Sequence, residues 1–421
     1  MYFLQVALCS RPRTVKYRSF NHSDGLTCVV DPKMDPEIEE MVRIAESCAL
    51  CRCGCCKDEC PMYAELLEET ISPKGRNQVI RAVVKGVVEP DGRVARIAYS
   101  CLLCRRDEMS CAAALKNADA TEAFRRYLAD SGVPPLPEHA LLLKSIENYG
   151  NPWQESRAAR KRWAKGPSDR RIVRGKTETL FYVGCTFALD RTLQETPRAL
   201  SRLMERAGVD FGCLLEEELC CGSTVKRIGQ SRLYDKLRAE NEKALLGTGA
   251  KRLVTACAGC FKTLTQDYPG ISKKIKVQHS TELLADLVSE GKLKFGRTSL
   301  KVTYHDPCHL GRHTGVYDPP RAILRSIPGL KLIEMKNSRE LSRCCGGGAG
   351  VKTAYPEVAA KAALARLREA EKTGADIVVT SCPFCVQTLK AAAVQSGSRM
   401  DIVELSVFLD GLPGPDGKVV K

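Results

Sequence analysis

The chain has 421 residues, of which 44% are hydrophobic, and this length can form two or three domains with cores of their own. Its formal net charge is +15, yet no helix-turn-helix or aromatic-interleaved basic motif is present, so we expect no nucleic-acid partner. No apolar run approaches the roughly 20 residues needed to span a membrane, and the 22 cysteines occur without a secretory signal. We therefore expect a cytoplasmic protein whose cysteines bind metal and which reaches the membrane face only through a partner.

Short helices separated by cysteine-rich loops are predicted for the N-terminal part of the chain. One helix is expected to begin at Asp35-Pro36 and another at Ser72-Pro73, because aspartate and serine cap helix N-termini and proline is favoured at the first helical position. Asp91-Gly92 predicts a turn, and a further helix is expected to lead from Val94 into Cys101. This part of the fold should therefore be mainly α-helical.

A connector rich in proline and basic residues is predicted for residues 131–178. Pro134, Pro135 and Pro137 open it, and a helix is expected from about residue 138 to residue 148. We interpret the basic run that follows as a solvated helix face and linker, because charge runs are usually exposed. The alternative is a docking surface for a partner or an anionic substrate. The basic residues of the run are Arg157, Arg160, Lys161, Arg162, Lys165, Arg170, Arg171 and Arg174.

From Thr179 onward the sequence alternates between strand-like and helix-like segments, in an order that occurs twice. Apolar strand runs end close to cysteines, and in α/β sheets ligands bind at the carboxyl ends of the strands. We therefore predict two duplicated α/β domains with a binding site at the strand ends. Strands are predicted at 180–183, 211–215 and 252–255 in the first copy and at 302–304, 330–333 and 377–379 in the second. Helices are predicted at 197–207 and 233–246 in the first copy and at 320–326 and 356–373 in the second.

Five cysteines recur in each copy with nearly the same spacing. The patterns are C-x34-CCG-x34-C-x2-C and C-x35-CCG-x35-C-x2-C, and corresponding cysteines are 123 to 125 residues apart. Five soft thiolates brought to one place predict iron–sulfur chemistry, and the fifth ligand favours a cluster other than a four-ligand cubane. The first set is Cys185, Cys220, Cys221, Cys257 and Cys260, and the second set is Cys308, Cys344, Cys345, Cys382 and Cys385.

The first group of N-terminal cysteines contains most of a bacterial ferredoxin run, C-x2-C-x2-C-x3-C-P, which binds a [4Fe–4S] cubane. Leu50 stands where the first cysteine of that run belongs, so either Cys51 or Cys48 must supply the first ligand. We favour Cys51. The residues that match the rest of the run are Cys53, Cys56 and Cys60, with Pro61 after them.

A second run follows the same template with one ligand changed. Asp107 stands where the third cysteine belongs, and a carboxylate is a harder ligand than a thiolate, so we expect a labile iron there. In a two-cluster ferredoxin the fourth cysteine of each run serves the other cluster, so Cys111 would complete the first cubane and Cys60 would join the second. The other ligands of the second cubane would be Cys101, Cys104 and either Asp107 or solvent. The alternatives are that one cluster is absent or that these cysteines bind zinc.

Three of the six histidines surround Cys308 at the start of the second set. They are His305, His309 and His313. One interpretation is that they cap a helix or hold the cysteine ligands in place by hydrogen bonds, as groups behind metal ligands do. The sharper hypothesis makes His305 or His309 a catalytic proton donor to a thiolate leaving group.

Together these motifs resemble the catalytic D-type subunits of heterodisulfide reductases, over residues from about 34 to 410. In that family each cysteine-rich CCG domain holds a non-cubane four-iron cluster bound by five cysteines, and the resemblance implies two such clusters here, with one or two cubanes in front of them. It implies an α/β fold with a mainly helical ferredoxin-like domain. The implied segments are an N-terminal extension (1–33), a ferredoxin-like domain (34–130), the connector (131–178) and two CCG domains (179–295 and 296–421).

The resemblance also implies a function. A disulfide such as the coenzyme M–coenzyme B heterodisulfide is cleaved between the two clusters, with electrons from a membrane cytochrome b-like subunit or another donor subunit. A small anionic disulfide would suit the basic chain. The alternative is an electron-transfer iron–sulfur subunit of a 2-hydroxyacid (glycolate or lactate) dehydrogenase or a related respiratory complex, which shares this layout and pairs it with a flavoprotein.

Overall fold

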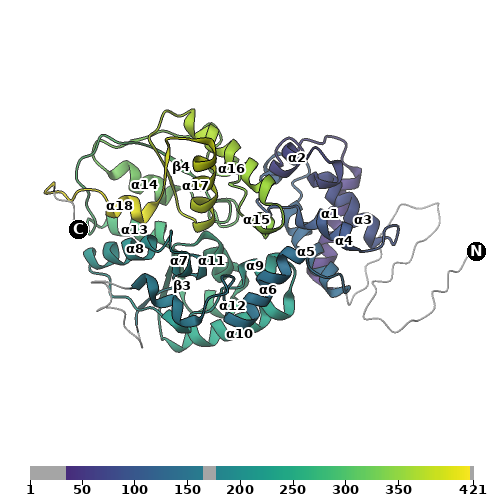
Figure 1. Cartoon of the computed structure of the whole chain (residues 1–421), viewed down its shortest axis with the longest axis horizontal. Coiled ribbons are helices and arrows are strands. Elements are labelled where there is room, and N and C mark those ends of the chain that lie inside the picture. The colour runs from purple at the N-terminus through teal and green to yellow at the C-terminus, as the bar shows by residue number, and fades with distance from the viewer. Residues whose placement is uncertain (1–34, 165–176, 418–421) are drawn as a thin grey trace, which may run out of the picture.

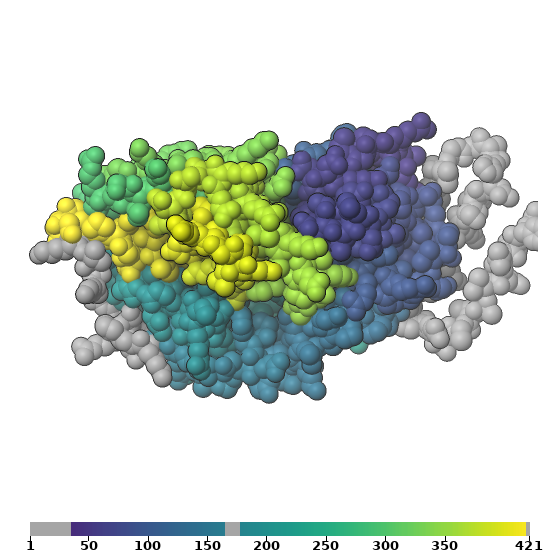
Figure 2. Space-filling model, turned by 45° about the horizontal axis from the view of Figure 1, so that its top comes forward, coloured from purple at the N-terminus to yellow at the C-terminus, as the bar shows by residue number. Residues whose placement is uncertain are grey.

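The computed structural model describes residues 35–164 and 177–417. A helical N-terminal region lies beside two α/β regions, which are stacked one above the other (Figure 1). In the space-filling view the N-terminal region packs against both repeats as one continuous body (Figure 2). The predicted fold class, a helical N-terminal region followed by two duplicated α/β domains, is confirmed.

The N-terminal region is built from α-helices whose starts follow the capping rules. The Asp35 carboxylate accepts a hydrogen bond from the Glu37 amide at 2.9 Å, and the Ser72 hydroxyl accepts one from Gly75 at 2.9 Å, which confirms both predicted helix starts. The α-helices of the region are α1 (Pro36–Leu50), α2 (Pro61–Leu66), α3 (Pro73–Val84), α4 (Gly92–Tyr99) and α5 (Asn117–Asp130), with short 3₁₀ turns η1 (Glu69–Ile71) and η2 (Asp107–Ser110).

The predicted turn at Asp91-Gly92 is wrong. Asp91 is instead the N-cap of α4, because its carboxylate accepts hydrogen bonds from the amides of Arg93 and Val94 at 2.9 and 3.0 Å. The helix therefore begins at Gly92, two residues before the predicted position. An aspartate–glycine pair fits a turn and a helix start equally well, and the apolar face of α4 decides between them by packing on α5.

The connector is more buried than its charge suggests. It forms α6 (Pro137–Tyr149) and a 3₁₀ helix η3 (Arg157–Ala164), which packs on the first repeat with Trp163 edge-on to Phe181. Arg160 is only 1% exposed, so the interpretation of the basic run as a solvated face is wrong at this residue. Lys165, Arg170, Arg171 and Arg174 lie outside the described residues.

The first repeat contains a three-stranded parallel sheet in the order β1-β2-β3. The predicted strand at 211–215 is wrong, because only Gly212 makes an isolated bridge to β1 and a 3₁₀ turn follows it. The strands are β1 (Thr179–Phe181), β2 (Arg252–Thr255) and β3 (Lys276–His279). The helices are α7 (Cys185–Leu189), α8 (Glu195–Arg206), η5 (Leu215–Glu217), α9 (Ser223–Arg227), α10 (Ser231–Gly247), α11 (Ala258–Lys262), the π-helical η6 (Thr263–Asp267), α12 (Pro269–Ser272) and α13 (Ser280–Ser289).

The second repeat contains a four-stranded parallel sheet in the order β5-β4-β6-β7, with the predicted strand at 330–333 reduced to two residues. The last strand of each repeat, β3 and β7, was not predicted from the sequence. The strands are β4 (Lys301–His305), β5 (Lys331–Leu332), β6 (Ile377–Thr380) and β7 (Asp401–Glu404). The helices are α14 (Asp318–Ser326), η7 (Arg339–Leu341), α15 (Val351–Ala354), α16 (Pro356–Glu371), α17 (Pro383–Ser396) and α18 (Leu405–Asp410).

One buried arginine joins all three regions. Arg125 of α5 is fully buried and donates hydrogen bonds to carbonyl oxygens of the N-terminal region, of the first repeat and of the second repeat. The acceptors are Ala98 at 3.0 Å, Arg227 at 2.8 Å and Ala349 at 3.1 Å. A guanidinium group holds several donors in a rigid plane, so it fixes these segments relative to one another. Among the described helices, none is both long and apolar enough to cross a membrane.

Candidate metal centres and the cavity between them

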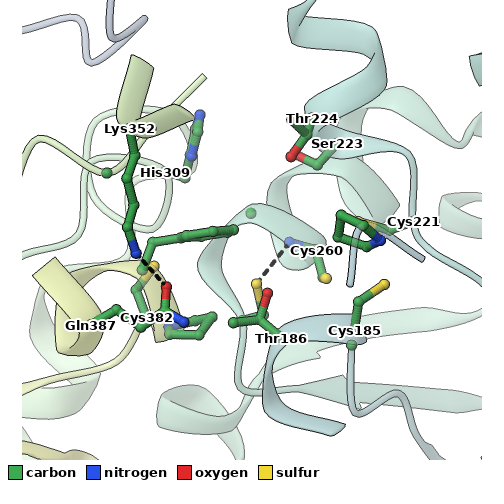
Figure 3. Close-up of a pocket in the computed structure, with 18 of the residues that line it drawn as sticks. Cys185, Thr186, Cys221, Ser223, Thr224, Cys260, His309, Lys352, Cys382 and Gln387 are labelled. Carbon is green, nitrogen blue, oxygen red and sulfur yellow. Dashed lines mark hydrogen bonds between the residues drawn. The ribbon is translucent and has the colours of Figure 1, made fainter. Parts of the chain in front are cut away.

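The two repeats face each other across one cavity of about 310 Å³. It lies beyond the carboxyl ends of the parallel strands, where α/β sheets bind ligands. Figure 3 shows Cys185, Cys221 and Cys260 on one side of it and Cys382, Lys352 and Gln387 on the other. The cysteines that line the cavity are Cys185, Cys220, Cys221, Cys257 and Cys260 of the first set and Cys308, Cys345, Cys382 and Cys385 of the second set.

The first cysteine set is buried and its thiols contact one another. Side-chain hydrogen bonds join Cys185 to Cys220 and Cys221 to Cys260, and the bond from Cys220 lowers the pKa of Cys221 to about 6. Gly184 leaves room for this group, because a Cβ atom there would lie 3.2 Å from the Cys260 sulfur. Five convergent buried thiols with a glycine cradle fit an iron–sulfur cluster.

A buried ion pair from the connector supports the first set. Arg160 donates to the Cys185 sulfur at 3.1 Å and to the Glu218 carboxylate at 2.8 Å, and Glu218 also accepts from the amides of Val183 and Gly184 at 2.8 and 2.9 Å. Burial raises the pKa of Glu218, against the charge of Arg160 and these amide donors. Arg160 therefore brings a positive charge directly to one thiol of the first set.

Beside the second cysteine set lies a histidine, His305, where the first set has Arg160. The Arg366 Nε–H group donates to Nδ1 of His305 at 3.0 Å, so the neutral ring carries its hydrogen on Nε2. A His305 ring nitrogen and the sulfur atoms of Cys345 and Cys385 lie within 4.8 Å of one another. Burial lowers the pKa of His305. The Nε2 atom of His305 has no hydrogen-bond partner among the described residues and His305 does not line the cavity, so it is placed to act on the cysteine sulfur atoms and not on a cavity ligand.

His309 and His313 differ in their surroundings. The His313 ring is 2.8 Å from the Leu103 carbonyl oxygen of the N-terminal region, and so it joins two regions. His309 lines the cavity, and its Nε2 atom has no hydrogen-bond partner within the described part of the chain. Burial lowers the pKa of His309 to about 3, with further lowering by Arg227 and Lys262. His309 is therefore a neutral ring with a free nitrogen on the cavity wall.

The structure brings Cys48 into the first N-terminal group. Burial raises the pKa of Cys48, and nearby Cys51 and Cys111 raise it further. Cys56 is likewise buried near Cys48 and Cys111. The Cys51 and Cys53 sulfur atoms are 3.3 Å apart, while the Cys53 side chain is exposed. Both Cys48 and Cys51 therefore lie close enough to this group to supply the first ligand.

The second N-terminal group meets the second repeat. Cys60, Cys101, Cys104 and Asp107 are all buried, and Asp107 accepts a hydrogen bond from Asn117 at 2.9 Å. Burial raises the pKa of Cys60 and Cys101, and nearby Asp107 adds to both shifts, whereas the interaction with Cys344 lowers the pKa of Cys104 to about 7. The thiol of Cys104 is hydrogen-bonded to Cys344 of the second five-cysteine set. This contact links the N-terminal cysteines directly to the second repeat.

Comparison with known proteins agrees with this geometry. The model of the CCG cysteine-rich domain matches residues 179–265 and 302–390. The D-type subunit of the dihydromethanophenazine:CoB–CoM heterodisulfide reductase of Methanosarcina barkeri is 34% identical over 406 residues, which cover 90% of this chain and 98% of that protein. The Methanosarcina mazei protein of the same name is 34% identical over 380 residues, 85% of this chain and 92% of the relative.

The chain belongs to the family of heterodisulfide reductase D-type subunits. A protein named EtfAB:quinone oxidoreductase, from Syntrophomonas wolfei, is also similar, with 32% identity over 326 residues that cover 73% of this chain and 46% of that protein. The chain is an iron–sulfur oxidoreductase with two cysteine-rich domains. The Methanosarcina relatives are named as subunits, so those proteins act with partner chains.

Three residues that the sequence analysis did not single out shape the site. Arg160 was counted only as part of a basic run, and Glu218 was not considered although it lies two residues before the Cys220-Cys221 pair. Lys352 lines the cavity and donates to Gln387 at 3.0 Å, and Gln387 in turn donates to Asp190 of the first repeat. The position of Glu218 beside a predicted ligand pair was the one available signal.

Proposed function

We propose that the chain reduces a small disulfide to two thiols in the cavity between the two cysteine sets. The observation that carries the proposal is that nine cysteines from two complete sets line one cavity of about 310 Å³, the lower end of the usual size of a small-molecule site. The reaction takes two electrons and two protons and breaks only the S–S bond. When bound, a non-cubane four-iron cluster on each set would supply electrons one at a time.

The other residues of the cavity favour a small anionic disulfide. Phe187 and Phe384 are among the apolar side chains that line it. Arg227, Lys352 and His309 also line it, whereas no aspartate or glutamate does among the described residues. We propose that the neutral His309 ring, which lines the cavity and whose Nε2 atom has no partner within the described chain, gives a departing thiolate a hydrogen bond, while the two protons come from water.

The Cys104–Cys344 contact supports a route for electrons from the N-terminal region into the second repeat. We propose that one or two cubane clusters on the N-terminal cysteines receive them from a donor subunit, such as a membrane cytochrome b-like subunit. The printed names of the Methanosarcina relatives pair dihydromethanophenazine with the CoB–CoM heterodisulfide. For this chain, a donor of the dihydromethanophenazine type and a substrate of the heterodisulfide type are both proposals.

The test is a disulfide-reductase assay on anaerobically prepared, cluster-loaded protein with reduced viologen as the donor. The CoB–CoM heterodisulfide and bis(2-hydroxyethyl) disulfide should both be tried, and the proposal expects viologen oxidation matched by two thiols for each disulfide. Absence of turnover in protein whose iron and sulfide content is complete would contradict the proposal. That result would favour an electron relay, the second candidate, which the similarity to an EtfAB:quinone oxidoreductase supports.

A further inference from the structure

A buried arginine beside the cavity carries guanidinium donors that no described residue accepts. Arg227, the last residue of α9, lines the cavity and is only 1% exposed. Its Nη2 atom donates to Asp267 at 2.9 Å, and its Nε atom lies 3.7 Å from the Glu122 carboxylate. Its Nη1 atom has no hydrogen-bond partner among the residues that the structure describes.

The charges around Arg227 do not cancel. Lys226 and Lys262 contact the same Asp267 carboxylate at 2.8 and 3.1 Å, so three cations face two carboxylates and one positive charge is left over. Burial alone would raise the pKa of Asp267, but Arg227, Lys262 and Lys226 outweigh it and lower that pKa, so the carboxylate is already ionised. The guanidinium group is paired with Asp267, but its Nε and Nη1 atoms have no acceptor among the described residues, and an anion at Nη1 would satisfy one of these buried donors.

The neighbouring cavity wall offers a second unpartnered group, which donates in its Nε2–H tautomer. The Nε2 atom of His309 is unpartnered within the described chain, and Arg227 is close enough for its charge to lower the pKa of His309. The third basic residue of the lining, Lys352, is already hydrogen-bonded to Gln387. No carboxylate is among the described residues that line the cavity, although the Asp267 carboxylate lies behind Arg227.

We infer that Arg227, together with His309, forms a binding site for an oxyanion group of the cavity ligand, such as a sulfonate, a phosphate or a carboxylate. The inference deepens the proposed function, since it assigns one charged end of the disulfide to the end of the cavity near Arg227. The planar guanidinium group suits a tetrahedral or planar oxyanion better than an ammonium group does.

The test is a binding measurement that needs no turnover. Ethanesulfonate, inorganic phosphate and propionate are titrated separately into anaerobic, cluster-loaded protein by isothermal titration calorimetry, with dimethyl sulfone as an uncharged comparison. At least one of the three anions should bind and dimethyl sulfone should not. Arg227→Gln should weaken the best anion by about tenfold or more, the effect of one hydrogen bond to a charged group.

Lys226→Gln is the matched control, because it removes the same charge from the same cluster. Lys226 is not among the cavity-lining residues and its side chain is 26% exposed, so this variant should weaken binding by no more than about threefold. Arg227→Lys keeps the positive charge but loses the planar guanidinium group, so its anion affinity should lie between those of Arg227→Gln and Lys226→Gln. This variant also serves if Arg227→Gln loses its clusters.

Equal anion affinity in the wild type and in both Arg227 variants would overturn the inference. So would an equal loss in Lys226→Gln, which would show that only the net charge matters. The proposed function fails separately, if the wild-type protein binds an anion but reduces neither disulfide. Turnover by a wild-type protein whose anion binding does not depend on Arg227 would leave the function standing and remove this site.

Discussion

The two repeats hold equivalent cysteines but meet different neighbours. In the first repeat, Cys185 receives a hydrogen bond from Arg160, which comes from the connector outside the repeat. In the second repeat, His305 faces Cys345 from within the repeat, and Cys104 of the N-terminal region contacts Cys344. Duplication therefore places equivalent cysteines in the two repeats, while a histidine of the second repeat and residues from outside the repeats give the two sets different surroundings.

A second difference lies at the last strand of each repeat. His279 ends β3 and Glu404 ends β7, and each side chain accepts a hydrogen bond from the helix that follows, from Thr281 at 3.2 Å and from Ser406 at 2.6 Å. Burial lowers the pKa of His279 to about 3 and raises that of Glu404 to about 8. Both groups are thus held neutral near pH 7, although they titrate in opposite directions.

The largest expected effect comes from removing one central cysteine of either set. Cys221→Ala and Cys345→Ala should each lower disulfide turnover by more than about 100-fold, beyond the loss usual for groups that only support a ligand. The two losses should not add in the double variant, because both sets act on one disulfide. Viologen-linked disulfide turnover measures the loss in each variant, and iron analysis shows how much cluster each variant retains.

Cys213→Ala is the matched control for those variants. Cys213 is buried in the first repeat but belongs to neither set, so its removal should leave turnover nearly unchanged. Full activity in either Cys221→Ala or Cys345→Ala would break the claim that both repeats take part.

The next effect tests the connector's contribution to the first repeat. Arg160→Met should lower the stability of the protein by about 3–5 kcal/mol, because it leaves the Glu218 carboxylate buried without its cation. Anaerobic denaturation of the cluster-loaded protein measures the change in the free energy of unfolding. The double variant Arg160→Met/Glu218→Leu should recover a large part of the loss, and a single variant as stable as the wild type would contradict the argument.

His279 and Glu404, at the ends of β3 and β7, should give opposite pH dependences of stability. The pKa of Glu404 is higher in the folded state than its ordinary 4.5, so its contribution is present below about pH 4.5 and is lost as the pH rises through about 8. Glu404→Gln should therefore match the wild type at pH 5 and exceed its stability at pH 8 by an amount on the order of 3 kcal/mol. Denaturation midpoints of the variant and the wild type at pH 5 and pH 8 measure the difference in stability.

His279 supplies the contrast for that experiment. Its folded-state pKa is depressed below the ordinary 6.5, so stability falls as the pH drops from about 6.5 toward 3. A neutral substitute, His279→Asn, should flatten the acid side of the profile and leave the alkaline side as it is. For Glu404, the contradicting result is a stability that changes with pH above pH 5 by the same amount in Glu404→Gln and in the wild type. That result would show that Glu404 is ionised in the folded protein.

The smallest expected effect concerns His305. His305→Leu removes an N–H group near the Cys345 and Cys385 sulfur atoms, and losing an interaction as strong as one hydrogen bond should lower the potential of the second cluster by about 20–60 mV. A redox titration followed by electron paramagnetic resonance measures each cluster. The first cluster should keep its potential, and an equal shift in both would contradict the assignment.

Local signals in the sequence predicted more of the fold than of the site. Asp35 and Ser72 predict helix starts because a cap depends on neighbours two or three residues away. The strand expected at 211–215 was wrong because strand pairing depends on a distant partner, and only Gly212 finds one. The roles of Arg160 and Arg227 could not be predicted, since their carboxylate partners lie 58 and 40 residues away along the chain.

The position of a bound disulfide tests the central claim most directly. Cluster-loaded crystals, grown anaerobically and soaked with the CoB–CoM heterodisulfide, would show it. We expect ligand density in the cavity between Cys221 and Cys345, with the two sulfur atoms of the ligand directed toward opposite repeats. A ligand bound elsewhere, or one that touches a single repeat, would contradict the claim that the disulfide is cleaved between the two sets.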